Sequence, residues 1–290
     1  MTGKIVVVGS FNADLVTYMP RLPLPGETLS GTRFVTGPGG KGSNQAVAAA
    51  RLGAQVTFIG RVGKDTLSEM AFNLWQQEGI DTRYVTRDEQ NATGVAAIFV
   101  EESGQNVIVV TLGANLAMST MDLDQAADVI SQADVLITQL EINHDTAAYA
   151  LKLARQQHVK TILNPAPALQ LPSEVTALAD FITPNETELL ILSGKSQVDE
   201  AASSLLQSEQ QTLIVTLGKQ GARWVQQSGD GVVPAYKVEA VDTVGAGDAF
   251  NAGLAVALAE GKQLIDAIAF ANAVAALCVT RHGAAASMPY

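Results

Sequence analysis

Short apolar runs rich in β-branched residues alternate along the chain with longer stretches that repeat apolar residues at helical spacing. The apolar runs cover residues 5–8, 56–59, 135–137, 161–163 and 213–215. Runs of this length and composition predict strands that are buried on both faces. Their alternation with helical patterns is typical of βαβ units, so the sequence predicts a mostly parallel sheet covered by helices.

The segment 66–79 illustrates the helical pattern. Thr66 and Glu69 have the spacing of a capping box, and Gly79 is suited to the left-handed turn that ends a helix. The apolar residues that share one face are Leu67, Met70, Ala71 and Leu74. The pattern therefore predicts one amphipathic helix across this segment.

Two stretches interrupt the alternation. Residues 18–34 contain three prolines and Gly26 before a short extended segment, and residues 93–110 consist of two β-type runs joined near residues 103–105. The second stretch has the composition of a β-hairpin. We expect both stretches to form a flap or a dimer surface outside the parallel core.

Composition limits the class of protein. With 290 residues and 47% hydrophobic content, the chain is long enough for one large α/β domain, although two small domains are also possible. Only 18 Lys and Arg stand against 29 Asp and Glu, which gives a net charge of -11. The chain therefore lacks the broad positive field needed to bind a phosphate backbone, and we expect no nucleic-acid partner.

Cysteine and hydropathy indicate the compartment. The single cysteine, Cys278, excludes an internal disulfide framework and a cysteine-based zinc site, and we expect it to be a small core residue. The first apolar run is too short for a signal-peptide core, and no run approaches the ~20 residues that span a bilayer. We expect a cytoplasmic protein with no membrane partner. The histidines fit no metal-ligand spacing and are expected to be solvated or structural; they are His144, His158 and His282.

The most informative motif is the glycine-rich turn at 241–250, which leads into an apolar helical pattern. Free N–H groups at a helix start favour an anion, such as a transferring phosphoryl group. Gly245 and Gly247 allow close approach of the backbone, and Asp248 in the first turn is placed to take a proton from an attacking hydroxyl. The alternative is an ordinary loop with an acidic residue at a helix start.

A second glycine-rich stretch, residues 37–44, precedes a small-residue helical pattern at 45–52. It is not a P-loop, because Lys41 is followed by Gly42 and the spacing is wrong. Lys41 and Asn44 are candidate donors to a small polar ligand. A tight structural turn is the alternative interpretation.

Polar residues also follow several predicted strands. Asn12 and Asp14 come just after the first strand, and their amide and carboxylate suit the hydroxyls of a sugar. Glu141, Asn185 and Glu188 follow later strands, where such groups hold Mg²⁺ near phosphates. Residues 216–221 come after another strand and are placed to pass beneath a nucleotide. Helix capping or a surface position is the alternative for each of these side chains.

Together these motifs resemble the ribokinase family of carbohydrate kinases, from residue 5 to residue 289. Residues 39–46 match its early glycine-rich signature, and residues 242–248 match its late signature, Asp-Thr-x-Gly-Ala-Gly-Asp, in full. Residues 185–188 match its Asn-x-x-Glu motif. One departure is that the sequence ends at Tyr290, where members of the family usually continue into a final helix.

The resemblance implies a single three-layer α/β/α sandwich over residues 1–290, with a mostly parallel central sheet. It also implies a small β flap from about residues 15–36 and 92–111, through which two copies form a homodimer. The implied reaction is ATP-dependent phosphorylation of D-ribose at its 5-hydroxyl. 2-Deoxyribose, fructose and nucleosides remain alternative acceptors.

The resemblance also implies roles for individual residues. Asp248 would be the base, with the anion hole formed by Gly245, Ala246 and Gly247. Sugar contacts would come from Asn12, Asp14, Gly40, Lys41, Gly42, Ser43, Asn44, Glu141 and Asp248. The nucleotide would be bordered by Asn185, Thr216, Leu217, Gly218, Lys219, Gln220, Gly221, Gly247 and Asn272. Glu188 would organise Mg²⁺ through water. A monovalent cation, usually K⁺, would be held mainly by backbone carbonyls among Asp242, Val244, Cys278, Arg281, Gly283 and Ser287.

Two other classes of function fit part of the pattern. A nicotinamide oxidoreductase would share the βαβ units, but residues 9–14 lack the Gly-x-Gly-x-x-Gly expected after the first strand. A catalytically silent sugar sensor would have lost the base or the anion hole, whereas both motifs are present. The sequence therefore favours a kinase.

Overall fold

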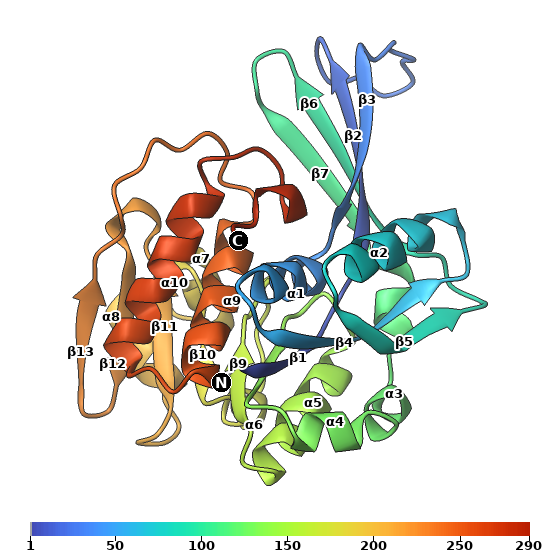
Figure 1. Ribbon diagram of the computed structural model, residues 1–290. Helices are drawn as coiled ribbons and strands as arrows, with labels where there is room; N and C mark the ends of the chain where they lie inside the picture. The colour runs from blue at the N-terminus through green and yellow to red at the C-terminus, as the bar shows by residue number, and fades with distance from the viewer. Residues whose placement is uncertain (1) are drawn as a thin grey trace.

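The computed structural model describes residues 2–290, and its largest element is a nine-stranded sheet (Figure 1). The sheet order is β13-β12-β11-β10-β9-β8-β1-β4-β5, and only β12 and β13 run antiparallel to their neighbours. The strands are β1 (Lys4–Val8), β4 (Gln55–Gly63), β5 (Asp81–Asp88), β8 (Val135–Thr138), β9 (Lys160–Leu163), β10 (Phe181–Ile182), β11 (Thr212–Thr216), β12 (Ala222–Gln226) and β13 (Gly229–Val233). All five strands predicted from apolar runs are confirmed, and all five lie in the parallel part.

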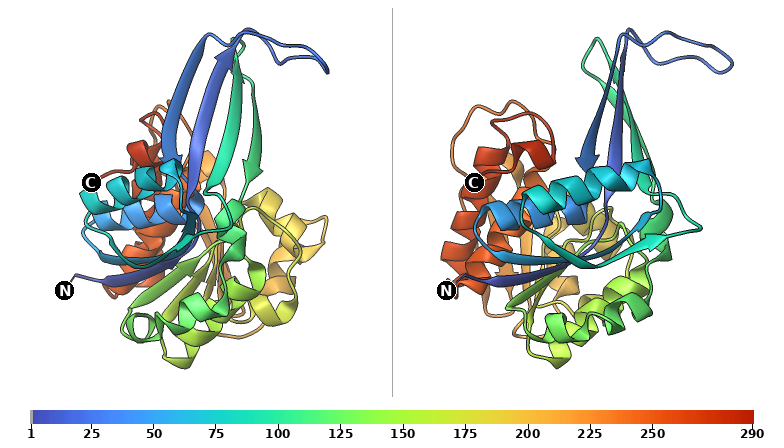
Figure 2. Two further views of the ribbon diagram at one scale, coloured as in Figure 1. Left: turned by 90° about the vertical axis from the view of Figure 1, so that its right-hand side faces the viewer. Right: turned by 45° about the vertical axis from the view of Figure 1, so that its right-hand side comes forward.

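Helices cover both faces of this sheet, which confirms the predicted three-layer sandwich (Figure 2). In β1, Ile5 and Val7 pack toward α1, α2, α9 and α10, whereas Val6 and Val8 pack toward α3, α4, α5, α7 and α8. The strand is apolar from Ile5 to Val8 because successive side chains enter opposite cores. The helices are α1 (Lys41–Arg51), α2 (Thr66–Gln77), α3 (Thr120–Asp124), α4 (Ala127–Ser131), α5 (His144–Gln156), α6 (Ser173–Thr176), α7 (Glu186–Ser193), α8 (Val198–Leu205), α9 (Ala246–Ala259) and α10 (Leu264–Cys278). Short 3-10 turns cover Gly113–Ala117, Gly218–Gln220 and Ala285–Ser287.

Two predicted helix starts are wrong. Helix α1 begins at Lys41 rather than residue 45, because Gly40 has a φ of 89° that turns the chain from β3 directly into the helix. Helix α2 is capped by Asp65, whose carboxylate accepts from the N–H groups of Leu67 and Ser68, so Thr66 is already inside the helix. The predicted left-handed end at Gly79, with a φ of 67°, is confirmed.

A second, four-stranded sheet stands out from the sandwich in both views of Figure 2, and we call it the flap. Its strands are β2 (Asn12–Met19), β3 (Arg33–Gly39), β6 (Gly94–Glu101) and β7 (Asn106–Thr111), in the order β3-β2-β6-β7. The predicted hairpin is the antiparallel pair β6 and β7. Asp65 ties the flap to α2, because its carboxylate also accepts from the N–H and hydroxyl of Thr93, just before β6.

No helix within residues 2–290 combines the length and the apolar character that a membrane crossing requires. Cys278 is fully buried at the end of α10, as expected for a core residue. His144 is the first residue of α5, and His158 has a φ of 59° just after that helix. Within the same described residues, no cluster of three or more His, Cys, Asp or Glu side chains is arranged for a metal ion.

Candidate active site

Asp248 lies where the N-terminal ends of α1 and α9 meet. Its side chain is buried, with 6% of the residue exposed. Both carboxylate oxygens accept from amides at the start of α1: Oδ2 from Asn44 Nδ2 at 2.9 Å and Oδ1 from Gln45 Nε2 at 3.0 Å. Each oxygen keeps a lone pair for a further donor.

The environment of Asp248 adjusts its acidity. Burial raises the pKa of this carboxyl to about 6, and the charge of Lys41 with the Asn44 and Gln45 amides opposes that rise. Asp248 is therefore mostly ionised at pH 7 and still basic enough to accept a proton.

The start of α9 presents backbone donors next to this carboxylate. Gly245 precedes the helix with a φ of 79°, a left-handed conformation that glycine adopts without strain. The N–H of Ala246 is directed at Thr243 O, 3.3 Å away, whereas no acceptor within residues 2–290 pairs with the N–H of Gly247. Gly247 is exposed, so its N–H is available to an anion.

Glu141 joins the loop after β1, the start of β2 and the start of α1. Its Oε2 accepts from Ser10 Oγ, from Asn12 Nδ2 at 3.3 Å and from the N–H of Lys41 at 2.9 Å. Glu141 is 8% exposed, so this carboxylate replaces lost water contacts with three protein donors. It thereby holds the β1–β2 loop against the start of α1.

Asp14 lies on β2 beside Gly39 of β3. A Cβ on Gly39 would come within 2.5 Å of the Asp14 carboxylate, so the glycine leaves room for this side chain. Burial and then the charge of Glu141 raise the pKa of Asp14 to about 6. A half-buried carboxylate of this kind is suited to accept hydroxyl hydrogen bonds.

Lys41 lies among the carboxylates of the site. Burial alone would lower its pKa, but the charges of Asp248, Glu141 and Glu188 raise it above the ordinary lysine value. Lys41 therefore stays protonated, and its charge interacts with Asp248, with Glu141 and with Glu188 at the start of α7.

Asn44 has one unpaired atom. Its Nδ2 donates to Asp248, but its buried Oδ1 has no partner among residues 2–290. Ser43, in contrast, turns into the core, where its hydroxyl accepts from Trp75 Nε1 at 3.0 Å, and Gly42 packs against the backbone of Ser10. The structure therefore brings Asn44 to the site and directs the predicted Ser43 side chain away from it.

A cleft of about 530 Å³ lies on the other side of Gly247, within the usual size range of small-molecule sites. Residues from the β11–β12 turn form one wall, and the start of α9 together with the C-terminal half of α10 forms the other. The predicted nucleotide residues that line it are Thr216, Gly218, Lys219, Gly221, Gly247 and Asn272. Leu217 packs against the core and Gln220 does not line the cleft. Asn272 also donates to the carbonyls of Val233 and Pro234, which fixes the wall beyond β13.

Asn185 and Glu188 form a reciprocal capping box at the start of α7. The Asn185 side chain accepts from Glu188 N, and the Glu188 carboxylate accepts from Asn185 N, both at 2.8 Å. Burial raises the pKa of Glu188, although this hydrogen bond and the Lys41 charge oppose the rise. One carboxylate oxygen has no protein donor among the described residues, which fits a role toward Mg²⁺ through water.

The residues predicted to hold a monovalent cation lie together beside the α9 start. The carboxylate of Asp242 accepts from Val244 N at 3.0 Å and from Gly283 N at 2.9 Å. Cys278 Sγ lies 3.9 Å from Val244 O and 3.1 Å from Ser287 Oγ, and Arg281 N donates to Cys278 O. Oxygen atoms of carboxylate, carbonyl and hydroxyl groups are ligands that suit a hard cation.

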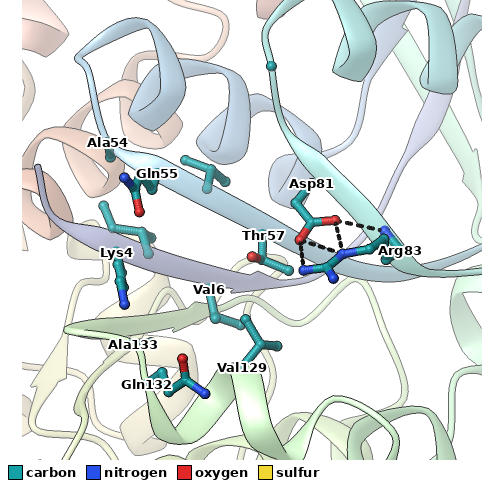
Figure 3. A pocket seen from close by; sticks show the side chains of 13 residues that line it. Lys4, Val6, Ala54, Gln55, Thr57, Asp81, Arg83, Val129, Gln132 and Ala133 are labelled. Carbon is teal, nitrogen blue, oxygen red and sulfur yellow. Dashed lines mark hydrogen bonds and ion pairs between the residues drawn. The ribbon is translucent and has the colours of Figure 1, made fainter.

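A second cavity, of about 410 Å³, lies at the amino ends of β1 and β4, away from Asp248 (Figure 3). Its carboxylate, Asp81, is engaged by the Arg83 guanidinium at 2.7 Å. Among the described residues that line it, this cavity therefore lacks the combination of a carboxylate free of an ion pair and a helix N-terminus that is found at Asp248.

Several polar residues of the site carried no predicted role. Ser10 donates to Glu141, and Gln45 donates to Asp248. Asn115 donates to Asn12 Oδ1 at 3.0 Å and so sets the orientation of that amide. Gln45 lies inside the early glycine-rich signature, and that position was the one sequence feature that could have marked it as a site residue. Asn115 lies in no comparable motif.

Comparisons with known proteins identify the family of this chain. The family model for pfkB family carbohydrate kinases matches residues 2–290. Ribokinase of Haemophilus influenzae is 42% identical, over 100% of this chain and 96% of its own length, and deoxyribokinase of Salmonella typhi is 38% identical, over 98% and 95%. The structure of Arabidopsis thaliana ribokinase complexed with ribose and ATP superposes with a TM-score of 0.92 at 33% identity, covering 100% of this chain and 96% of that one.

Proposed function

The chain belongs to the pfkB family of carbohydrate kinases, and from that premise we propose that it transfers a phosphoryl group from ATP to the 5-hydroxyl of D-ribose. The products are ribose 5-phosphate and ADP. The observation that carries this proposal is the position of Asp248, between the sugar-facing residues and the exposed N–H of Gly247.

Asp248 acts as the base. Its carboxylate accepts the proton of the 5-hydroxyl as that oxygen attacks the terminal phosphorus, and the proton then passes to solvent. The N–H groups at the start of α9 and the charge of Lys41 stabilise the negative charge of the transferred group. Positioning and electrostatics supply most of the rate in phosphoryl transfer, so this division of work needs no covalent intermediate.

The sugar is held by Asp14, Asn12, Asn44 and Glu141, with backbone from Gly40 and Gly42. Asp14 accepts hydrogen bonds from sugar hydroxyls. The unpaired Oδ1 of Asn44 accepts a hydrogen bond from another sugar hydroxyl, next to Asp248. Leaving a buried acceptor unmatched costs about 1–3 kcal/mol, which a bound sugar hydroxyl would recover.

ATP occupies the cleft bordered by Thr216, Gly218, Lys219, Gly221 and Asn272. Glu188, with Asn185 beside it, would hold Mg²⁺ through water near the phosphates, and the bound ion would neutralise charge on the transferred phosphoryl group. Asp242 and the oxygen atoms around it would hold K⁺, whose charge would stabilise the turn before α9.

A homodimer through the flap is the proposed assembly. All of β7 is exposed, and four consecutive apolar residues on it, Val107, Ile108, Val109 and Val110, are between 43% and 55% exposed. An exposed apolar edge strand favours pairing with another strand. A second copy would cover this edge. We also propose a cytoplasmic location, where ATP is available as co-substrate.

2-Deoxyribose is the rival acceptor, and the similarity to a deoxyribokinase supports keeping it. The test is kcat/KM for ribose, 2-deoxyribose, fructose and a nucleoside, measured by sugar-dependent ADP formation with and without K⁺. We expect ribose to give the highest value and K⁺ to increase turnover. If kcat/KM is higher for 2-deoxyribose than for ribose, 2-deoxyribose is the substrate. If no sugar gives ADP formation, the proposed kinase activity is refuted.

A further inference from the structure

A chain of buried amides contacts Asp248, and none of its members lines the cleft. Gln45 is fully buried, Gln139 is 1% exposed and Asn164 is 6% exposed. Gln45 Nε2 donates to Asp248 Oδ1 at 3.0 Å and to Asn164 Oδ1 at 3.1 Å, while Gln45 Oε1 accepts from Gln139 Nε2. Both N–H donors of the Gln45 amide and its oxygen are therefore engaged by these three residues.

Only one orientation of these amides forms all of the hydrogen bonds between them, and it leaves Gln139 Oε1 without a partner among residues 2–290. The carbonyl of Thr183 can only accept, so Asn164 must direct its Nδ2 there, at 3.3 Å, and its Oδ1 toward Gln45. Ionised Asp248 can also only accept. Gln45 consequently faces two acceptors and must present its NH₂ group to both, which leaves its oxygen for Gln139.

We propose that Gln45 is a positioning residue that fixes the rotation of the Asp248 carboxylate and leaves the remaining lone pairs free for the acceptor hydroxyl. The proposal rests on the proposed function, in which Asp248 is the base. Gln45 differs from Asn44 in this respect, because Asn44 has an unpaired oxygen for a substrate and Gln45 has none.

The Gln45 amide also favours the ionised form of Asp248. Burial raises the pKa of this carboxyl, and the Gln45 hydrogen bond is among the interactions that oppose the rise. The other charged or titratable groups that act on Asp248 are Lys41 on α1, Glu141 after β8 and Cys278 on α10. Loss of the Gln45 donor leaves all of these in place, so the pKa of Asp248 must rise.

The test compares Gln45→Met with a matched control, Gln211→Met. Gln211 is 2% exposed, donates to the carbonyls of Thr176 and Ala179 at 2.7 and 2.8 Å, and accepts from Gln207 N at 2.9 Å. Gln211→Met therefore removes three buried hydrogen bonds, the same number as Gln45→Met. Gln211 lies just before β11, at the amino end of that strand. Both variants are measured for thermal stability and for kcat/KM against pH with ribose and saturating MgATP.

We expect both variants to lose stability, but only Gln45→Met to move the low-pH limb of kcat/KM upward, by on the order of one pH unit. A limb at the wild-type position in Gln45→Met would refute the positioning role and leave Gln45 purely structural. Asp248→Asn, assayed in parallel, separates the two proposals. If it keeps wild-type turnover, the base assignment itself fails; if its turnover collapses while Gln45→Met keeps the wild-type limb, only the Gln45 inference fails.

Gln45→Glu keeps the shape of the side chain and serves if Gln45→Met does not fold. It places a second carboxyl against Asp248, and such neighbours raise each other's pKa. We expect the low-pH limb to move further upward than in Gln45→Met. An unmoved limb in this variant would overturn the inference equally.

Discussion

Glu141→Gln isolates the effect of one buried charge on the site. Glu141 Oε2 accepts from Ser10, Asn12 and Lys41, and a glutamine oxygen in the same place keeps these three donors while losing the negative charge. Hydrogen bonds to a charged acceptor contribute about 1.5–3 kcal/mol and neutral ones about 1 kcal/mol. Relief from burying the charge offsets part of the loss, so we expect net destabilisation of about 1–2 kcal/mol. In a domain of this size that lowers Tm by a few degrees.

The same substitution changes the pH dependence in a defined direction. The charge of Glu141 contributes, after burial, to raising the pKa of Asp14 to about 6, and it also raises that of Asp248. Removing the charge lowers both pKa values, so both carboxylates stay ionised at lower pH. The low-pH limb of kcat/KM for ribose therefore moves to lower pH, opposite to the direction expected for Gln45→Met.

The assay is kcat/KM for ribose against pH, with Glu78→Gln as the control. Glu78 is a partly buried carboxylate, paired with Arg51 at 2.6 Å near the far end of α1. We expect the control to lose stability without moving the limb. A limb that stays in place or moves upward in Glu141→Gln would refute the assigned electrostatic coupling between Glu141 and the two aspartates.

Two further predictions concern the flap. Gly94→Ala places a Cβ 2.2 Å from Asn12 Oδ1 and 2.4 Å from Asn115 Nδ2, and overpacking of this kind costs about 1–3 kcal/mol. We expect KM for ribose to rise about tenfold or more with KM for ATP little changed, and an unchanged ribose KM would contradict the sugar role of Asn12. Val109→Glu adds a charge to an exposed strand residue, 55% accessible, and should convert the proposed dimer to a monomer, measured by light scattering. A dimer that persists in Val109→Glu would place the interface elsewhere.

The sheet was predictable because its strands are buried on both faces. Residues 5–8 and 135–137 are apolar throughout, since neighbouring side chains enter two different cores. Helix starts were less predictable. The start of α1 depends on a positive φ at Gly40, and the cap of α2 is an aspartate whose other partner, Thr93, is 28 positions away.

The sequence motifs singled out Asp248, the glycine-rich turn before it and Asn44, which the structure brings together, but not the hydrogen bonds between them. Asn44 and Asp248 are 204 positions apart, and Gln45 and Asn164 are 119 apart. Such pairs form only when α1, α9 and β9 pack together, and no local spacing encodes them. The Asn-x-x-Glu motif has the opposite character: its reciprocal capping box at Asn185 and Glu188 is entirely local.

The central claim is that Asp248 is the base of a sugar kinase, and Asp248→Asn tests it most directly. An isosteric amide cannot accept the proton, and general-base catalysis typically contributes about 10²–10⁴-fold. We predict that kcat falls by about that factor while calorimetric Kd values for ribose and ATP change only a few-fold. Wild-type turnover in Asp248→Asn would contradict the account.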